Sequence, residues 1–189
     1  MKQLEEMILE KGRIIDNEII KVDSFINHQV NPHFTRTLAR YFVDEFKDVK
    51  IDKVLTLETS GIPIAYAVAD ILDVDMVFAK KSKSKIVGNE LYHEEVRSFT
   101  RGTVSDVTVA KEFLHEDENV LIVDDFLAKG NAAIGLINIC KQAGAHPVGV
   151  CAAIEKSFQG GRDLIEAQGL KVVSGANIIA FKDNKPIFG

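Results

Sequence analysis

The chain has 189 residues, 46% of them hydrophobic and 27% charged, and its formal net charge is −5. This composition is typical of one folded domain, residues 1-189, and excludes a disordered or fibrous protein. The negative net charge argues against a nucleic-acid partner, because proteins that bind phosphate backbones need a basic surface.

Neither an export signal nor a membrane-spanning helix is expected. The first residues, MKQLEEMILEKG, mix charges among their apolar positions. The longest clearly apolar stretch, Val148 to Ile154, is far shorter than the ~20 residues that a membrane helix needs. We therefore expect a cytoplasmic protein without membrane contact.

The cysteines and histidines give no sign of a disulfide framework or a metal centre. Cys140 lies in a helical pattern and Cys151 in a strand pattern, which favours two buried thiols. The five histidines show no metal-ligand spacing with either cysteine. We expect no metal site built from the protein alone.

The first half of the chain predicts two covering helices and a strand–helix–strand unit. Apolar residues recur at helical spacing over Lys2 to Lys11 and over Asn31 to Lys47. A strand over Lys53 to Glu58, a helix over Gly61 to Leu72 and a strand over Asp75 to Lys80 are expected next. Such a unit is typical of α/β proteins.

The stretch from 81 to 101 is rich in charged residues, and its apolar residues are too scattered to form a core face. We expect a long excursion outside the sheet, part loop and part hairpin; loops of this length are usually functional or disordered. Beyond it the alternation resumes, with strands expected at Val120–Asp124, Pro147–Glu155, Lys171–Ser174 and Asn177–Phe181 and helices at Asn131–Ala143 and Gly161–Gln168.

Apolar strands that alternate with helices predict an α/β fold with a mainly parallel sheet covered on both faces. In such sheets, ligands bind beyond the carboxyl ends of the strands. This rule selects four places along the chain: Glu58–Gly61, Lys80–Lys81, Asp124–Ala132 and Glu155–Gln159.

Two acids, Asp124 and Asp125, end an expected strand and precede a loop of small residues. Carboxylates can accept hydrogen bonds from hydroxyl groups, and the amides of a small-residue loop at a helix N-terminus can bind phosphate. This combination suits a sugar phosphate. The alternative is structural: the acids cap the next helix and Gly130 turns the chain. The dinucleotide fingerprint GxGxxG and the phosphate loop GxxxxGK[ST] are both absent.

The stretch VLIVDDFLAKGNAA resembles the phosphoribosyl-diphosphate-binding motif of the type I phosphoribosyltransferases. It departs from many members at Lys129-Gly130, where they have Thr-Gly, and at Asn131-Ala132, where they have small or hydroxyl residues. The resemblance implies a mainly parallel twisted sheet flanked by helices, a small hood from about 1-30 plus the C-terminal region, and a flexible lid at about 81-105. It also implies a 5′-phosphate loop made of Ala128, Lys129, Gly130, Asn131 and Ala132.

A second stretch, LETSGI, is open to two interpretations. On its own it predicts a turn in which Thr59 or Ser60 caps a helix. In the family this place is the diphosphate-binding loop, and the basic contact to the same diphosphate ends the next strand. The resemblance therefore implies diphosphate contacts from Glu58, Thr59, Ser60, Gly61, Lys80 and Lys81 and a catalytic role, at the ribose hydroxyls, for Asp124 and Asp125.

Two further stretches, KVDSFINHQVNP and IEKSFQGGRD, narrow the resemblance to the bacterial xanthine phosphoribosyltransferases of the Bacillus type, over essentially the full chain. This implies xanthine contacts from Ile20, Asn27 and Lys156. The amide of Asn27 and the ammonium of Lys156 are donors, which suits the 2-oxo group of xanthine. Without the resemblance, Asn27 is a turn residue and Lys156 a surface lysine.

The implied reaction is purine salvage: xanthine and 5-phospho-α-D-ribose 1-diphosphate give xanthosine 5′-monophosphate and diphosphate. The resemblance implies Mg²⁺, carried with phosphoribosyl diphosphate, and a homodimer. The alternatives are a hypoxanthine/guanine or adenine phosphoribosyltransferase, or a purine regulator that senses phosphoribosyl diphosphate. A regulator needs a DNA-binding module, and the first 30 residues are too short for a winged helix and lack a basic stripe.

Overall fold

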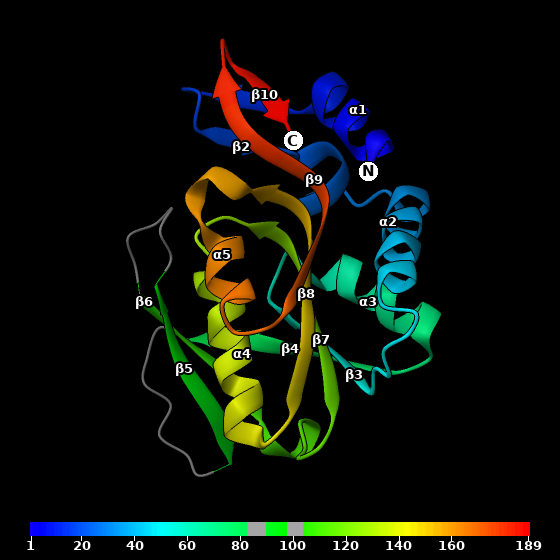
Figure 1. Ribbon diagram of the computed structural model, residues 1–189, viewed down its shortest axis with the longest axis vertical. Helices are drawn as coiled ribbons and strands as arrows, with labels where there is room; N and C mark the ends of the chain where they lie inside the picture. Colours follow the sequence, from blue (N-terminus) through cyan, green and yellow to red (C-terminus); the bar gives the residue numbers. More distant parts are fainter. Residues whose placement is uncertain (83–89, 98–103) are drawn as a thin grey trace.

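The computed structural model describes residues 1–82, 90–97 and 104–189. Within these ranges, eight strands form one sheet in the order β10-β9-β8-β7-β3-β4-β6-β5 (Figure 1). The five central strands, β9 to β4 in this order, are parallel, and the edge strands are antiparallel to their neighbours. The bounds are β3 Lys53–Leu57, β4 Asp75–Ser82, β5 Leu91–Arg97, β6 Val104–Ala110, β7 Asn119–Leu127, β8 His146–Lys156, β9 Lys171–Lys182 and β10 Lys185–Phe188.

Helices cover both faces of the sheet, as the apolar strands predict. Strand β7 shows the division: Leu121 and Val123 pack into one core with α2 and α3, whereas Val120 and Ile122 pack into another with α4. Successive strand residues point to opposite faces, so a strand between two cores has to be apolar at every position. The helices are α2 Pro32–Glu45 and α3 Ile62–Leu72 on one face and α4 Asn131–Ala143 and α5 Gly161–Glu166 on the other.

The described parts of the segment that we expected outside the sheet belong to it. Strand β4 continues to Ser82 and pairs with β6, with Lys80 opposite Thr108, and β5 then pairs with β6 as the expected hairpin. The expectation was wrong because Val107 and Val109 alternate with polar residues and bury one face of β6 against the α4 core. Residues 83–89 and 98–103 of the expected lid lie outside the described residues.

The two short strands expected near the C-terminal end are a single strand, β9. The expected interruption between the two strands falls at Gly175 and Ala176. In the structure a Cβ at Gly175 would lie 2.8 Å from Leu38 of α2 and 2.9 Å from Leu4. The glycine therefore marks a close crossing of two helices over the strand and not an end of it.

The first 30 residues form structure that the hydrophobic pattern predicts only in part. After α1 (Lys2–Lys11), as expected, come a hairpin of β1 (Arg13–Ile15) and β2 (Ile19–Lys21) and a π-helical turn, Asp23–Asn27. The hairpin turn lies against the turn between β9 and β10, where the backbone N–H of Asn17 donates to Asn184 Oδ1 (3.1 Å) and the N–H of Asn184 donates to Asn17 Oδ1 (2.6 Å). Figure 1 shows α1, β2 and β10 together at one end of the molecule; we call residues 1–30 with β10 the hood.

Two 3₁₀ turns complete the described elements, Lys111–Phe113 and Ser157–Gln159. Both cysteines are buried and unpaired, as expected, and burial raises the pKa of the Cys140 thiol to about 12. No helix in the described ranges is both long enough and apolar enough to cross a membrane.

Candidate active site

The carboxyl ends of β3, β4, β7 and β8 meet at one edge of the sheet because these strands are parallel. Hydrogen bonds join the ends of β3 and β4 directly. The backbone N–H of Glu58 donates to the Ala79 carbonyl (3.1 Å), and the N–H of Lys81 donates to Glu58 Oε1 (2.6 Å). The structure therefore brings the expected diphosphate loop, Glu58–Gly61, together with the basic end of β4.

Gly61 holds this loop against the acids of β7. A Cβ at Gly61 would lie 2.8 Å from Asp124 Oδ1 and would also collide with Thr56 Oγ1. Only a residue without a side chain permits this approach. Thr56 is fully buried, and its hydroxyl has no hydrogen-bond partner. Sequence reasoning passed over Thr56, which reads as an ordinary β-branched strand residue.

The alternative in which the polar residues serve as helix caps is wrong. Helix α3 has Gly61 as its N-cap and α4 has Gly130, and neither helix has a side-chain cap. Asp124 instead accepts a hydrogen bond from the backbone N–H of Asp125 (2.9 Å) through Oδ1. The strand also continues through both acids to Leu127. The acids therefore lie within β7 and are directed to this edge of the sheet.

The surroundings of the two carboxyl groups raise the pKa of each. Burial and then the charge of Asp125 raise the pKa of Asp124 well above its usual range, and the charge of Lys81 opposes this rise. Burial also raises the pKa of Asp125, against hydrogen bonds from Asp124 and Asn27. The charge of Lys81 compensates only in part for two half-buried carboxylates side by side, so the site favours a cation or hydroxyl donors.

The two neighbouring lysines at the end of β4 do not have equal access to the acids. Lys81 is close enough to Asp124 for its charge to lower the pKa of that carboxyl group. Lys80 precedes it in the same strand, and successive strand residues point to opposite faces. Both side chains are exposed. The structure thus brings Lys81 to the acids.

Asn27 comes from the hood and reaches the acids directly. It ends the π-helical turn, and its side chain hydrogen-bonds to Asp125. The Oδ1 atom of Asn27 is buried without a partner. A buried amide oxygen without a partner is uncommon in native proteins and suits an N–H donor from a ligand. The turn residue of the alternative interpretation is thus a part of this cluster.

Lys156 and Ile20 lie on the hood side of the same edge. Lys156 ends β8, and its Nζ donates to the backbone carbonyl of Glu18 (3.0 Å) and lies 5.7 Å from the centroid of the Phe181 ring. Burial lowers the pKa of Lys156. Ile20 is buried in β2, two residues beyond Glu18. Lys156 is therefore not the freely solvated lysine of the alternative interpretation.

The expected phosphate loop, Ala128–Ala132, leads into α4. Gly130 has a φ of 80°, in the left-handed region that favours glycine, and it precedes the first residue of the helix. The loop rests on the start of α5, where the N–H of Gly161 donates to the Ala128 carbonyl (3.1 Å). Backbone amides at the N-terminus of a thirteen-residue helix form a natural phosphate site.

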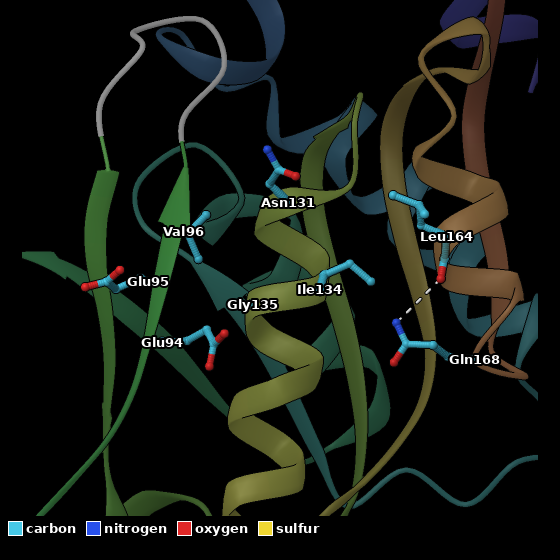
Figure 2. Close-up of a pocket in the computed structure, with 8 residues that line it drawn as sticks. All are labelled: Glu94, Glu95, Val96, Asn131, Ile134, Gly135, Leu164 and Gln168. Carbon is cyan, nitrogen blue, oxygen red and sulfur yellow. Dashed lines mark hydrogen bonds between the residues drawn. The ribbon is translucent and has the colours of Figure 1, made fainter.

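A cavity of about 450 Å³ lies beside the phosphate loop, between β5 and the helices α4 and α5 (Figure 2). Asn131 belongs to both the loop and the cavity wall. Glu94 on the opposite wall is held by Asn138 (3.1 Å) and Gln142 (3.2 Å) of α4. The lining residues are Glu94, Glu95, Val96, Asn131, Ile134, Gly135, Leu164 and Gln168.

Comparison with known proteins identifies this arrangement. The model of the family described as "Phosphoribosyl transferase domain" matches residues 27–181. The chain belongs to the phosphoribosyltransferase family. This match includes the strand ends described above and most of the helices that surround them.

Relatives of this phosphoribosyltransferase match over nearly its full length. The xanthine phosphoribosyltransferase of Finegoldia magna is 46% identical, over 100% of this chain and 99% of the relative. That of Streptococcus uberis is 48% identical, over 98% and 96%. That of Laribacter hongkongensis is 45% identical, over 100% of both chains. The expected resemblance to bacterial xanthine phosphoribosyltransferases is confirmed.

Solved structures of the family have the same fold. The adenine phosphoribosyltransferase of Giardia lamblia, complexed with 9-deazaadenine, matches with a TM-score of 0.75 at 20% identity, over 89% of this chain and 94% of the other. That of Trypanosoma brucei, in complex with AMP, pyrophosphate and ribose-5-phosphate, matches with a TM-score of 0.77 at 18% identity, over 96% and 83%. The expected type I phosphoribosyltransferase fold is confirmed.

The phosphoribosyltransferase site fits a metal ion that arrives with its substrate. In the described part of the chain, no group of three or more histidine, cysteine or acidic side chains could hold a metal. Asp124 and Asp125 supply a pair of hard oxygen donors with too little positive charge nearby. Mg²⁺ prefers such ligands together with the oxygens of a bound phosphate.

Proposed function

We propose that this protein is a xanthine phosphoribosyltransferase of purine salvage, which converts xanthine and phosphoribosyl diphosphate to xanthosine 5′-monophosphate and diphosphate. The observation that carries the proposal is the identity of 45–48% to full-length relatives named xanthine phosphoribosyltransferase. The cluster in which Asn27, Asp125 and Gly61 gather around Asp124 supports it.

In this proposal the sugar phosphate spans the edge of the sheet. Amides of the loop Ala128–Ala132 bind the 5′-phosphate, and Asp124 and Asp125 accept hydrogen bonds from the ribose hydroxyls. Glu58–Gly61 with Lys80 and Lys81 bind the diphosphate, with Lys81 as the nearer lysine. The acids of β7 and oxygens of the substrate would hold Mg²⁺, which would neutralise charge on the diphosphate when bound.

The reaction breaks the bond between ribose C1′ and the diphosphate oxygen, whose electron pair leaves with the diphosphate. The lone pair of N9 of xanthine forms the new bond to C1′, and the proton of N9 passes to solvent. Positive charge develops on the ribose during this exchange, close to the carboxyl groups of β7. Catalysis then consists mainly of positioning and of stabilising charge.

Xanthine is expected under the hood. Ile20 supplies an apolar contact, and Asn27 and Lys156 supply polar ones. The surroundings of Asn27 favour an acceptor role and not the donor role expected from the sequence: its side chain hydrogen-bonds to Asp125 and leaves Oδ1 without a partner, so the oxygen can accept an N–H of the base. The Lys156 ammonium can donate to an oxo group. A base without matching groups leaves these polar atoms unpaired, which disfavours it.

Incubation with phosphoribosyl diphosphate, Mg²⁺ and each of xanthine, guanine, hypoxanthine and adenine tests the proposal, with diphosphate release as the measurement. We expect kcat/KM for xanthine to exceed that for the other bases by about tenfold or more. Equal turnover of hypoxanthine or adenine contradicts the choice of base. Turnover of none contradicts the enzyme and favours the regulator.

Three further expectations stay predictions. The homodimer is tested by sedimentation equilibrium, which should give twice the mass of the chain. The lid at about 81-105 is tested by proteolysis with and without phosphoribosyl diphosphate and xanthine. The cytoplasmic location is tested by cell fractionation.

A further inference from the structure

One ion pair lies between the phosphate loop and the base side of the site, outside the set of residues proposed to bind the substrates. Glu155 precedes Lys156 in β8 and is fully buried. Arg162 of α5 grips it with two hydrogen bonds, from Nε to Oε1 (2.8 Å) and from Nη2 to Oε2 (2.5 Å). This forked geometry fixes both direction and distance between the two elements.

Arg162 also has partners that hold α5 in one orientation. Its Nη1 donates to Glu166 Oε1 (2.9 Å) within the helix and to the Val172 carbonyl of β9 (3.1 Å). The hydrogen bond to Glu155, followed by that to Glu166, raises the pKa of Arg162, so the guanidinium keeps its charge. The pair is a permanent link between β8, α5 and β9.

The phosphate loop rests on the residue before this arginine. The Gly161 N–H donates to the Ala128 carbonyl (3.1 Å), and a Cβ at Gly161 would lie 2.7 Å from the Gly130 nitrogen. Strand register adds a second connection, because Glu155 pairs with Leu127, the residue that precedes the loop. A shift of α5 therefore moves the loop backbone with it.

We infer that Glu155 and Arg162 are a positioning pair that sets, from one point, both the phosphate loop Ala128–Ala132 and the strand end that carries Lys156. The inference rests on the proposed function. Neither residue touches a substrate in this assignment. The contact between Glu155 and Arg162 fixes the distance between the phosphoribosyl diphosphate site and the base site. The reacting atoms of the two substrates can approach correctly only at the right distance.

The matched test compares two carboxylate-to-amide changes in two partly buried ion pairs. Glu155→Gln removes the charge that faces Arg162. Glu118→Gln does the same at the opposite edge of the sheet, where Glu118 accepts from Lys53 Nζ (2.7 Å). Both retain side-chain volume and one acceptor oxygen. Arg162→Lys is the further variant, because it retains the charge and loses the fork.

Two measurements separate positioning from general loss of stability. Equilibrium binding of phosphoribosyl diphosphate without any base reports on the phosphate side, and KM for xanthine reports on the base side. We expect both to weaken about tenfold or more in Glu155→Gln and Arg162→Lys. Glu118→Gln should lose comparable thermal stability while both values stay within twofold of the parent.

Values within twofold of the parent in Glu155→Gln or Arg162→Lys would overturn the inference, and so would equal losses in Glu118→Gln. Weakening on one side alone also contradicts it, because the pair is inferred to set both. Failure of the proposed function can be distinguished from failure of this inference. If the proposed function is wrong, the parent protein shows no turnover of xanthine, but its binding of phosphoribosyl diphosphate still tests the role of the ion pair.

Discussion

The carboxyl groups of Asp124 and Asp125 occupy one enclosed position at the end of the sheet, which is costly for the free protein. Burial opposes the ionisation of both groups, and the charge of Asp125 adds to this effect at Asp124, so the raised pKa values of both groups record a cost to the folded state. Function explains why the chain retains them. Residues that serve a ligand are often unfavourable for stability.

The first prediction is that Asp124→Asn stabilises the fold and impairs catalysis. The folded-state pKa of Asp124 lies above its usual 3.8, so ionisation opposes folding, and the variant should gain most in Tm above the raised pKa. The gain should shrink as pH falls toward 3.8, where both states of the parent take up the proton. We expect kcat/KM to fall by about 100-fold. Thermal unfolding from pH 4 to 8, with steady-state kinetics, provides the measurement; a lower Tm at pH 8 contradicts the prediction.

The second prediction concerns the Thr56 hydroxyl, which is buried without a partner. Thr56→Val replaces it with a methyl group of similar size, and the free energy of unfolding should rise by about 1 kcal/mol, because a buried hydroxyl without a hydrogen bond is unfavourable. Thr35→Val is the control, since its buried hydroxyl donates to the Asn31 carbonyl (2.9 Å) and its removal should give no gain. Urea unfolding measures both variants; equal effects would show that Thr56 has a partner in solution.

At the scale of elements, the site depends on loops and strand ends that approach without intervening side chains. The loop after β3 meets β7 at Gly61, and the loop after β7 meets α5 at Gly161. Each contact leaves no room for a Cβ. Substitution at such a glycine should therefore alter function through geometry, independently of any hydrogen-bonding group.

The third prediction is that Gly61→Ala lowers kcat/KM by about tenfold or more. The new Cβ would lie 2.8 Å from Asp124 Oδ1, so the loop Glu58–Gly61 has to move away from Asp124. Gly169→Ala is the control. It adds the same methyl group at a φ of 79° with nothing within 4 Å, so it should cost about 1 kcal/mol of stability and leave kinetics unchanged. Steady-state kinetics of both variants at equal folded fraction decide; unchanged kinetics for Gly61→Ala would mean that the loop adapts.

The sequence predicts the bounds of a helix or strand correctly where a local pattern of residues sets them. It fails where contacts with distant parts of the chain set them. The helix Asn131–Ala143 was predicted with its bounds because Gly130 and Gly144 mark both ends. The break at Gly175 misled, because its cause is the crossing of α1 and α2 over β9. Strand β10 follows a turn at Asp183-Asn184, both at positive φ, a recognisable hairpin signal that the apolar pattern alone does not show.

The candidate site divides in the same way. Asp124, Asp125 and the phosphate loop were predicted from a strand end followed by small residues. Asn27 and Lys156 were predicted from family resemblance alone, since nothing local distinguishes them. Thr56 and the Glu155–Arg162 pair were missed, because their importance depends on burial and on partners far along the chain.

On the scale of the whole molecule, charge is arranged differently at the two edges of the sheet. At the edge where β3 and β7 begin, charges are paired: Lys53 binds Glu118, and Asp52 binds Lys50 (2.7 Å) and Asn119. At the opposite edge, burial opposes the ionisation of both acids of β7, Asp124 and Asp125. One edge contributes stability and the other retains unsatisfied groups for a substrate.

The fourth prediction is that removing a carboxylate at the paired edge changes Tm in the opposite direction to removing one at the edge with the acids of β7. The hydrogen bond from Lys50, followed by those from Asn119, lowers the pKa of Asp52 from 3.8 to about 2. Its stabilisation is therefore fully present above pH 3.8 and is lost as pH falls toward 2. Asp52→Asn should lower Tm at pH 7, whereas Asp124→Asn should raise it. The Tm values of Asp52→Asn and the parent should become equal near pH 2. Thermal unfolding against pH measures it; a constant difference down to pH 2 would exclude this origin.

The reciprocal hydrogen bonds between Asn17 and Asn184 have a consequence for biosynthesis. These residues lie 167 positions apart, so the hood hairpin has no turn to fasten to until nearly the whole chain has left the ribosome. The strands β3, β4, β7 and β8, and with them Asp124 and Asp125, are therefore synthesised before the hood hairpin acquires this contact.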